Sequence, residues 1–268
     1  MTTRAVILAR GLGTRMRRAD GNQDVTLAQA DVAATGVKAL IPVGRPFLDY
    51  GLAALADAGI TEIGLVIGPE HQSVRDYYAS LALSRLRVHF IVQQEPRGTA
   101  DAVLAAEAWT DGQPFLVLNS DNYYPVSALT SLAALDEPAL VAFSRAGLVA
   151  DGQINPARMA SFAVLELDGD FLVRIIEKPN SGELSRLGPT LWVSMNCWRF
   201  DAQIFDACRQ VPLSPRGELE LPAAVGLALA DGRMRIRAVR VNLPVLDLSR
   251  RTDIPGVAAR LSGLEVRL

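Results

Sequence analysis

Short apolar runs and longer segments with helical spacing alternate along the first half of this sequence. Buried strands are predicted at residues 5–9, 63–67, 88–92 and 115–118. Helices are predicted at residues 47–58, 73–83 and 100–109, where apolar side chains recur every three to four positions. Because strands that alternate with helices form parallel sheets with right-handed crossovers, the pattern predicts a doubly wound α/β sheet with helices on both faces.

The second half has a different pattern. Residues 161–167 and 171–176 flank Asp168-Gly169-Asp170 and predict a β-hairpin. Further strands are predicted at residues 192–199 and 234–241, and helices at residues 202–208, 218–229 and 255–261. The polar stretch 17–36 is predicted to be a loop. No repeat or Pro/Ser-rich linker divides the chain, so we expect one domain over residues 1–268, with one continuous sheet shared by both halves.

Composition excludes several classes of protein. The chain has 27 Lys and Arg against 29 Asp and Glu, whereas a general nucleic-acid binder needs a basic face. Two cysteines, Cys197 and Cys208, are too few for a disulfide scaffold, and with only His71 and His89 a zinc site is not expected. The N-terminal apolar run is too short for a signal peptide and no run is long enough to cross a bilayer. We therefore expect a soluble cytoplasmic protein with no membrane partner.

The strongest local signal is the segment from Leu8 to Met16, where a predicted strand runs into Gly11-Leu12-Gly13-Thr14-Arg15. Glycines after a strand let backbone N–H groups approach an anion, and Arg15 adds a cation. The Gly-Lys-Ser/Thr ending of a Walker A loop is absent, and Met16 occupies the position of the third glycine of a Rossmann fingerprint. A plain strand-to-loop turn is the alternative interpretation.

Two further segments are candidates for nucleotide binding. Lys38 follows the Gly-rich segment and precedes an apolar run, so it is either a phosphate ligand or a solvated strand edge. Gln93 lies at the end of a predicted strand, and Gly98-Thr99 precedes an Ala-rich helix whose first N–H groups are free to bind a ligand. An ordinary helix cap is the alternative for the second segment.

Charged residues also follow three other predicted strands. Asp121 lies after the strand at 115–118, Glu177-Lys178-Pro179 after the hairpin, and Asp247 after residues 243–246. Ligands of open parallel sheets bind outside the carboxyl ends of the strands, and a carboxylate there suits Mg²⁺ with phosphates. Each of these residues is also compatible with a simple exposed turn.

In combination and order, these segments resemble the sugar-1-phosphate nucleotidyltransferases over nearly the whole chain, from residue 5 to about residue 255. Residues 8–16 look like the family's Gly-x-Gly-Thr-Arg loop, residues 38–42 like its Lys-x-Leu-x-Pro segment, and residues 93–103 like its nucleobase-binding segment. The resemblance implies a GT-A-like, Rossmann-like mixed sheet, mainly parallel, with a nucleotide-binding half at about 1–125 and a sugar-phosphate-binding half at about 126–268. The implied reaction joins an NTP to a sugar 1-phosphate and gives an NDP-sugar and pyrophosphate.

The resemblance also assigns roles to individual residues. The catalytic residues would be Arg15, Lys38 and Asp121, and Mg²⁺ would be held by Asp121 and Asp247. The sugar phosphate would contact Glu177, Lys178 and Asn196. The nucleotide would contact Leu8, Ala9, Arg10, Gly11, Gly13, Thr14, Gln93, Gly98 and Thr99. The Gln93 amide both accepts and donates, which favours uracil or thymine and hence UTP or dTTP. The expected partners are therefore the NTP and the sugar 1-phosphate, and a homo-oligomer is compatible with the sequence.

The sequence departs from the family pattern at several positions. Arg10 replaces a Gly or Ala, Val37 replaces a Pro, and Leu248-Ser249-Arg250-Arg251 replaces a Gly-Thr. The long interval between Arg15 and Lys38 predicts an inserted loop that covers the site. We expect Arg10 to lie against the base or ribose, or to pair with an acid of that loop such as Asp20 or Asp24.

These departures keep other functions open. A non-catalytic, nucleotide-sugar-sensing homologue is one alternative, and a cytidylyltransferase of the phosphocholine type is another. A GT-A glycosyltransferase is a weaker match, because Asn119-Ser120-Asp121 does not supply that class's Asp-x-Asp motif.

Overall fold

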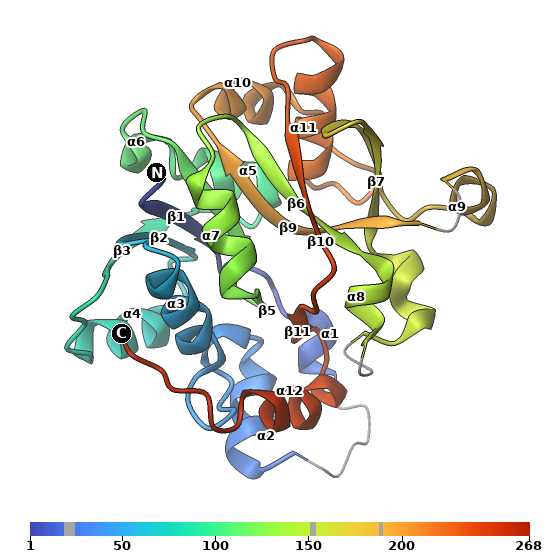
Figure 1. Cartoon of the computed structure of the whole chain (residues 1–268). Coiled ribbons are helices and arrows are strands. Elements are labelled where there is room, and N and C mark those ends of the chain that lie inside the picture. The colour runs from blue at the N-terminus through green and yellow to red at the C-terminus, as the bar shows by residue number, and fades with distance from the viewer. Residues whose placement is uncertain (19–24, 151–153, 188–189) are drawn as a thin grey trace.

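A nine-stranded mixed sheet forms the centre of the protein, as the computed structural model shows (Figure 1). The structure describes residues 1–18, 25–150, 154–187 and 190–268. In spatial order the strands are β3 (Arg87–Val92), β2 (Glu62–Ile67), β1 (Arg4–Leu8), β4 (Phe115–Asn119), β9 (Trp192–Phe200), β6 (Ala139–Ser144), β10 (Arg237–Val241), β8 (Phe171–Ile176) and β7 (Ala163–Asp168). Strands from both halves of the chain therefore pair within one sheet.

Most strands of this sheet run in one direction. The predicted parallel set β3-β2-β1-β4 is present, with Val6 opposite Gly64 on one side and Val117 on the other. Strand β9 pairs antiparallel with both β4 and β6, and β8 pairs antiparallel with β10 and β7. The carboxyl ends of β1 to β4 consequently share one edge of the sheet, which is where ligands bind in such folds.

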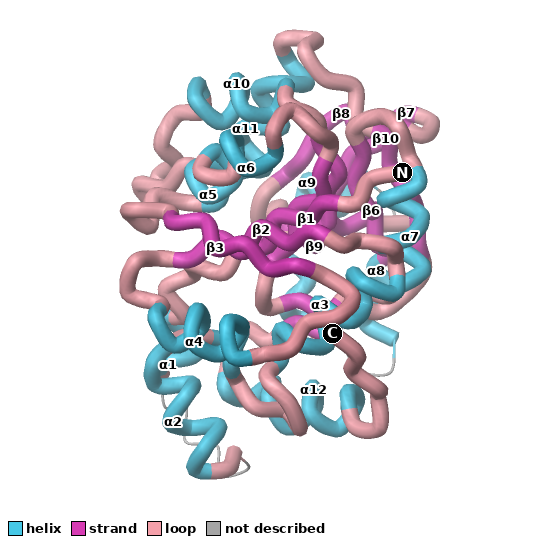
Figure 2. The backbone as a smooth tube through the Cα atoms, turned by 90° about the vertical axis from the view of Figure 1, so that its left-hand side faces the viewer, coloured by secondary structure: helices cyan, strands magenta, loops and turns pink. Residues whose placement is uncertain are grey.

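Helices cover both faces of the sheet, because successive strand residues point to opposite sides (Figure 2). In β1, Ile7 packs into the core beneath one face and Val6 into the core beneath the other. The first face carries α3 (Phe47–Asp57), α4 (Gln72–Ser80), α7 (Val126–Ala134) and α8 (Arg145–Val149). The second face carries α5 (Thr99–Leu104), α6 (Glu107–Thr110), α10 (Gln203–Gln210) and α11 (Leu221–Ala230).

A third apolar cluster joins the two ends of the sequence beside the carboxyl edge. Met16 of α1 (Thr14–Arg17) and Ala33 of α2 (Leu27–Thr35) pack with Ile254 and Leu261 of α12 (Ile254–Leu261). A short ladder, β5 (Asn122–Tyr123) with β11 (Leu246–Asp247), carries Asp247 to the same region. The remaining elements are η1 (Lys38–Leu40), η3 (Pro156–Ser161), α9 (Ser181–Leu187) and η4 (Arg251–Asp253).

The structure corrects several predicted elements. Residues 17–36 are not all loop, because α2 begins at a capping box in which Thr26 and Gln29 bond each other's backbone. The helix predicted at 100–109 is divided into α5 and α6. Strand β6 and helix α7 lie in a stretch for which we had predicted no element. Within the described residues, no helix is long and apolar enough to cross a membrane.

Candidate functional site

A cleft of about 460 Å³ lies along the carboxyl ends of β1, β3 and β4. All of the predicted catalytic and nucleotide-binding residues line it. They are Leu8, Ala9, Arg10, Gly11, Gly13, Thr14, Arg15, Lys38, Gln93, Gly98, Thr99 and Asp121. Segments separated by more than a hundred residues thus meet in one cleft of a size that suits a small-molecule ligand.

The Gly-rich turn between β1 and α1 is held by a close backbone contact. Gly13 has a left-handed φ of +60°, and a Cβ atom there would lie 2.3 Å from the carbonyl oxygen of Gly36. Only glycine satisfies both conditions. The buried Met16 anchors the following turn, whereas Arg15 is exposed at the cleft. The turn therefore presents its backbone and one cation to the cleft while its far side is packed.

The Gln93 side chain, directly after β3, is fixed by two hydrogen bonds in the cleft lining. Its Nε2 donates to the carbonyl oxygen of Gly98 at 3.1 Å and to Asp101 Oδ2 at 2.7 Å. Since both partners are acceptors, both amide protons are used within the protein, and the amide oxygen remains as the acceptor for a ligand. The predicted donation from Gln93 to a base therefore does not fit this geometry, and acceptance from a base stays a prediction.

Gly98 and Thr99 have packing roles as well. A Cβ on Gly98, whose φ is +122°, would lie 2.4 Å from the carbonyl oxygen of Leu219. The Thr99 hydroxyl accepts from the backbone N–H of Leu221 at 2.8 Å. These contacts join the start of α5 to the segment before α11, whose Arg216 and Glu218 also line the cleft.

Arg10 forms an ion pair with Glu70, which lies in the turn after β2. Its Nη2 donates to Glu70 at 3.3 Å, and the residue is only 8% exposed. Its Nε and Nη1 are buried without a hydrogen-bond partner among the described residues. This acid, Glu70, lies in the turn after β2, whereas the predicted partners Asp20 and Asp24 lie outside the described residues, so pairing with an acid of the long loop stays a prediction. Contact between Arg10 and a base or ribose stays a prediction.

Lys38 and Asp121 form an ion pair in the cleft. The Lys38 ammonium donates to Asp121 Oδ2 at 2.7 Å, and both side chains are largely buried. Lys38 lies on η1 and not on a strand edge, so the alternative interpretation of this residue is wrong. Asp121 lies two residues after the end of β4, at the carboxyl end of a buried strand as predicted.

Asp247 is buried close to Asp121. Its pKa is raised above the ordinary value, first by desolvation and then by the negative charge of Asp121. Arg158 Nη2 donates to Asp247 Oδ2 at 2.6 Å, and Asp247 lines a second cavity beside α12. Two neighbouring carboxylates match the usual protein contribution to a Mg²⁺ site, in which phosphates and waters complete the shell. No third His, Cys, Asp or Glu joins them within the described part of the chain.

The predicted sugar-phosphate residues lie outside the lining of the cleft. Glu177 has a raised pKa because of desolvation and then the charge of Glu220, and its charge also interacts with Arg216, which lines the cleft. Lys178 and Asn196 have left-handed φ values of +46° and +53°. Such conformations are uncommon for residues other than glycine and concentrate at functional sites. The Asn196 carbonyl accepts from the Tyr124 hydroxyl at 3.4 Å.

Sequence reasoning missed other residues of this region. Asn119 and Ser120 line the cleft and precede Asp121 directly, so their position after a buried strand was a usable signal. Arg216 and Arg158 carried no such signal. Arg158 is 89 positions from Asp247, and their contact depends on the tertiary structure.

Comparison with known proteins is consistent with this geometry. Glucose-1-phosphate thymidylyltransferase of Streptomyces antibioticus is 30% identical over 241 residues, which cover 85% of this chain and 58% of that protein. The UTP–glucose-1-phosphate uridylyltransferase AglF of Haloferax volcanii is 26% identical over 271 residues, with 96% of each chain covered. For several curated relatives, this chain spans 48% to 58% of their length.

The fold has counterparts among solved structures. A crystal structure of UDP-glucose pyrophosphorylase complexed with UDP-glucose superposes with a TM-score of 0.75 at 17% sequence identity, covering 97% of this chain and 98% of that one. The predicted α/β fold is thereby confirmed. The family model described as nucleotidyl transferase matches residues 4–242. Because this match includes the Gly-rich turn, Lys38, Gln93 and Asp121, and covers most of the sequence, the chain belongs to the nucleotidyl transferase family.

Proposed function

We propose that this protein transfers a nucleotidyl group from UTP or dTTP to a sugar 1-phosphate, giving an NDP-sugar and pyrophosphate. The observation that carries the proposal is the single cleft that brings together the Gly-rich turn, Lys38 and Asp121. Family membership supports the reaction class, and the named relatives support glucose 1-phosphate as a first substrate to test.

The chemistry needs orientation and charge compensation more than a nucleophilic side chain. An oxygen of the sugar phosphate forms a bond to the α-phosphorus, and the bond from that phosphorus to the β-phosphate oxygen breaks. Arg15 and the amides of the Gly-rich turn bind the triphosphate, and Lys38 compensates charge on the α-phosphate or pyrophosphate. When bound, Mg²⁺ supplies further compensation of phosphate charge. Asp121 and Asp247 would hold it.

Base and sugar recognition are assigned to opposite ends of the site. The Gln93 oxygen, which has no hydrogen-bond partner among the described residues, accepts from N3–H of uracil or thymine, whereas cytosine and adenine offer an acceptor at the corresponding ring position. Glu177, Lys178 and Asn196 contact the sugar phosphate beyond the cleft. The left-handed backbone at Lys178 and Asn196 supports a functional role for that region.

Pyrophosphate release tests the proposal across a panel of NTPs and sugar 1-phosphates. We expect release with UTP or dTTP and a hexose 1-phosphate, and loss of the signal when EDTA removes divalent cations. A protein that binds nucleotide but releases no pyrophosphate with any pair would instead be the nucleotide-sugar-sensing homologue. Release with CTP and phosphocholine alone would identify the cytidylyltransferase alternative.

A further inference from the structure

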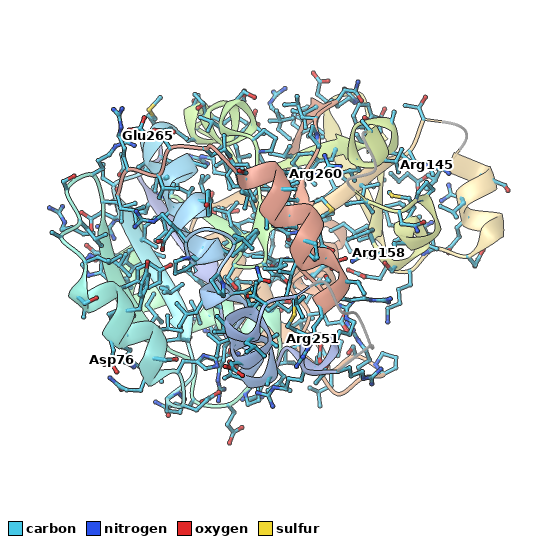
Figure 3. All side chains as sticks on the ribbon, turned by 90° about the horizontal axis from the view of Figure 1, so that it is seen from below. Asp76, Arg145, Arg158, Arg251, Arg260 and Glu265 are labelled. Carbon is cyan, nitrogen blue, oxygen red and sulfur yellow. The ribbon has the colours of Figure 1, made fainter. Side chains whose placement is uncertain are left out.

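Arg158 bridges two carboxylates next to the proposed metal site. It lies on η3, and its Nη2 donates to Asp247 Oδ2 at 2.6 Å while its Nη1 donates to Asp253 Oδ1 at 3.2 Å. Figure 3 shows Arg158 beside α12, the helix that begins next to Asp253. The guanidinium therefore has a second anchor that does not depend on Asp247.

The other oxygen of Asp247 is also occupied. Asn122 Nδ2 donates to Oδ1 at 3.2 Å, and the Ser249 hydroxyl lies 3.0 Å from the same atom. A carboxylate has about four lone-pair positions, so one remains for another ligand. The Asp247 side chain is only 6% exposed, and a buried charge of this kind depends on its cationic partner.

Asp121 is also paired with a cation, because the Lys38 ammonium donates to its Oδ2 at 2.7 Å. Each of the two carboxylates assigned to Mg²⁺ is thus paired with a cation of the protein. A free divalent cation that approaches Asp247 would be repelled by the positive charge of Arg158, because the guanidinium is already hydrogen-bonded to Asp247 Oδ2. A bound nucleotide would change this competition, because its phosphates supply negative charge that attracts both Lys38 and the metal. Arg158 would then keep its hydrogen bond to Asp253 while Asp247 binds the metal.

We propose that Arg158 is a positioning residue that competes with Mg²⁺ for Asp247, so that the site takes up the metal together with the nucleotide and not alone. The proposal rests on the function proposed above. It gives the departing segment after Asp247 a role, because Ser249 of that segment bonds Asp247, and Asp253, two residues beyond the segment, bonds Arg158.

Binding of Mg²⁺ alone to the nucleotide-free protein tests this inference by isothermal titration calorimetry. We expect weak binding to the wild type and binding about tenfold or more tighter to Arg158→Gln, which removes the competing charge. Arg250→Gln is the matched control, because Arg250 is exposed, lines the same cavity and carries the same charge. It should bind Mg²⁺ like the wild type. Adding Asp247→Asn to Arg158→Gln should abolish the gain.

Equal Mg²⁺ affinity of the wild type and Arg158→Gln would overturn the inference, as would an equal gain in Arg250→Gln. If Arg158→Gln does not fold, Arg158→Lys keeps a cation but loses the two-pronged contact. That variant should show an intermediate gain, and an unchanged affinity would overturn the inference in the same way. Pyrophosphate release by the wild type separates the two proposals. If the wild type releases pyrophosphate but Arg158→Gln does not bind Mg²⁺ more tightly, only the role of Arg158 is contradicted. If Arg158→Gln binds Mg²⁺ more tightly but the wild type releases no pyrophosphate, only the enzymatic function is contradicted.

Discussion

The ammonium of Lys38 lies 2.7 Å from Asp121 Oδ2, although 83 positions separate the two residues in sequence. The pair links η1, which follows the Gly-rich turn, to the end of β4. Each residue neutralises the charge of the other, which lowers the cost of keeping both charges in a partly enclosed cleft. The ion pair therefore holds these two segments together at the cleft.

Replacing Arg15 by Ala should reduce kcat on the order of 10²-fold with little loss of stability, because its exposed cation faces the cleft and no core. Steady-state pyrophosphate release and a thermal melt measure the two effects. Arg18→Ala is the control, since Arg18 is exposed nearby and is not part of the cleft lining. Equal rates in the two variants would contradict the triphosphate role of Arg15.

The Arg10–Glu70 pair should affect nucleotide binding as a unit, since it ties the Gly-rich turn to the turn after β2. Arg10→Met and Glu70→Gln should each weaken nucleotide affinity, and the double variant should be no weaker than either one. A coupling free energy of about 0.5–1 kcal/mol is expected for a pair with one half-exposed partner. If the losses of nucleotide binding free energy in the two single variants, measured by calorimetry, simply add in the double variant, the Arg10–Glu70 pair does not stabilise the Gly-rich turn for nucleotide binding.

Asp49 should be important for stability, because it is fully buried on α3 and accepts from three side chains. Tyr77 and Tyr78 of α4 donate to it at 2.6 Å and 3.0 Å, and Arg45 donates at 3.2 Å. Asp49→Asn should lower the free energy of unfolding in urea by about 2 kcal/mol. The exposed Asp76→Asn serves as the control. A change below about 0.5 kcal/mol in Asp49→Asn would contradict this role.

Alkaline pH should weaken the same contact. Desolvation, and then the neighbouring Asp49, raise the pKa of Tyr77 to about 12. The folded state then holds the phenolic proton more tightly than the unfolded chain, whose tyrosines titrate near about 10. The stabilising contribution is complete below about pH 10 and is lost as pH rises toward 12. The free energy of unfolding, measured in urea, should fall as the pH is raised from about 10 to about 12. Tyr77→Phe should make this fall smaller. An equal fall in Tyr77→Phe would contradict the contribution of Tyr77.

Local patterns predicted the elements that form the nucleotide end of the site. Local sequence patterns were enough to predict three features, because each depends on neighbouring residues. They are the strand at residues 5–9, the turn at Gly11–Gly13 and the position of Asp121 after a buried strand. The helix α2 was missed although Thr26 and Gln29 have capping-box spacing, since its apolar positions are mostly alanines and gave no strong periodic signal. Strand β6 was missed although its residues 139–144 are buried throughout, since a short apolar run is ambiguous between strand and helix.

Long-range partners were beyond a local analysis. The pairing of Arg10 with Glu70 and of Arg158 with Asp247 follows only from the tertiary structure, which brings together elements far apart in the sequence. The antiparallel insertion of β9 between β4 and β6 is a topological feature of the same kind. Charge and residue type marked these side chains as polar, but only the fold decides which charges meet.

Isotope exchange tests the central claim most directly. With labelled pyrophosphate, Mg²⁺ and UDP-glucose or dTDP-glucose, the wild type should return label to UTP or dTTP, because the proposed transfer is reversible. Removal of Mg²⁺ or the change Asp121→Asn should abolish this exchange, whereas the same substitution at the exposed Asp136 should leave it unchanged. Absence of label in any NTP, from folded wild-type protein that binds the nucleotide-sugar, would contradict the account.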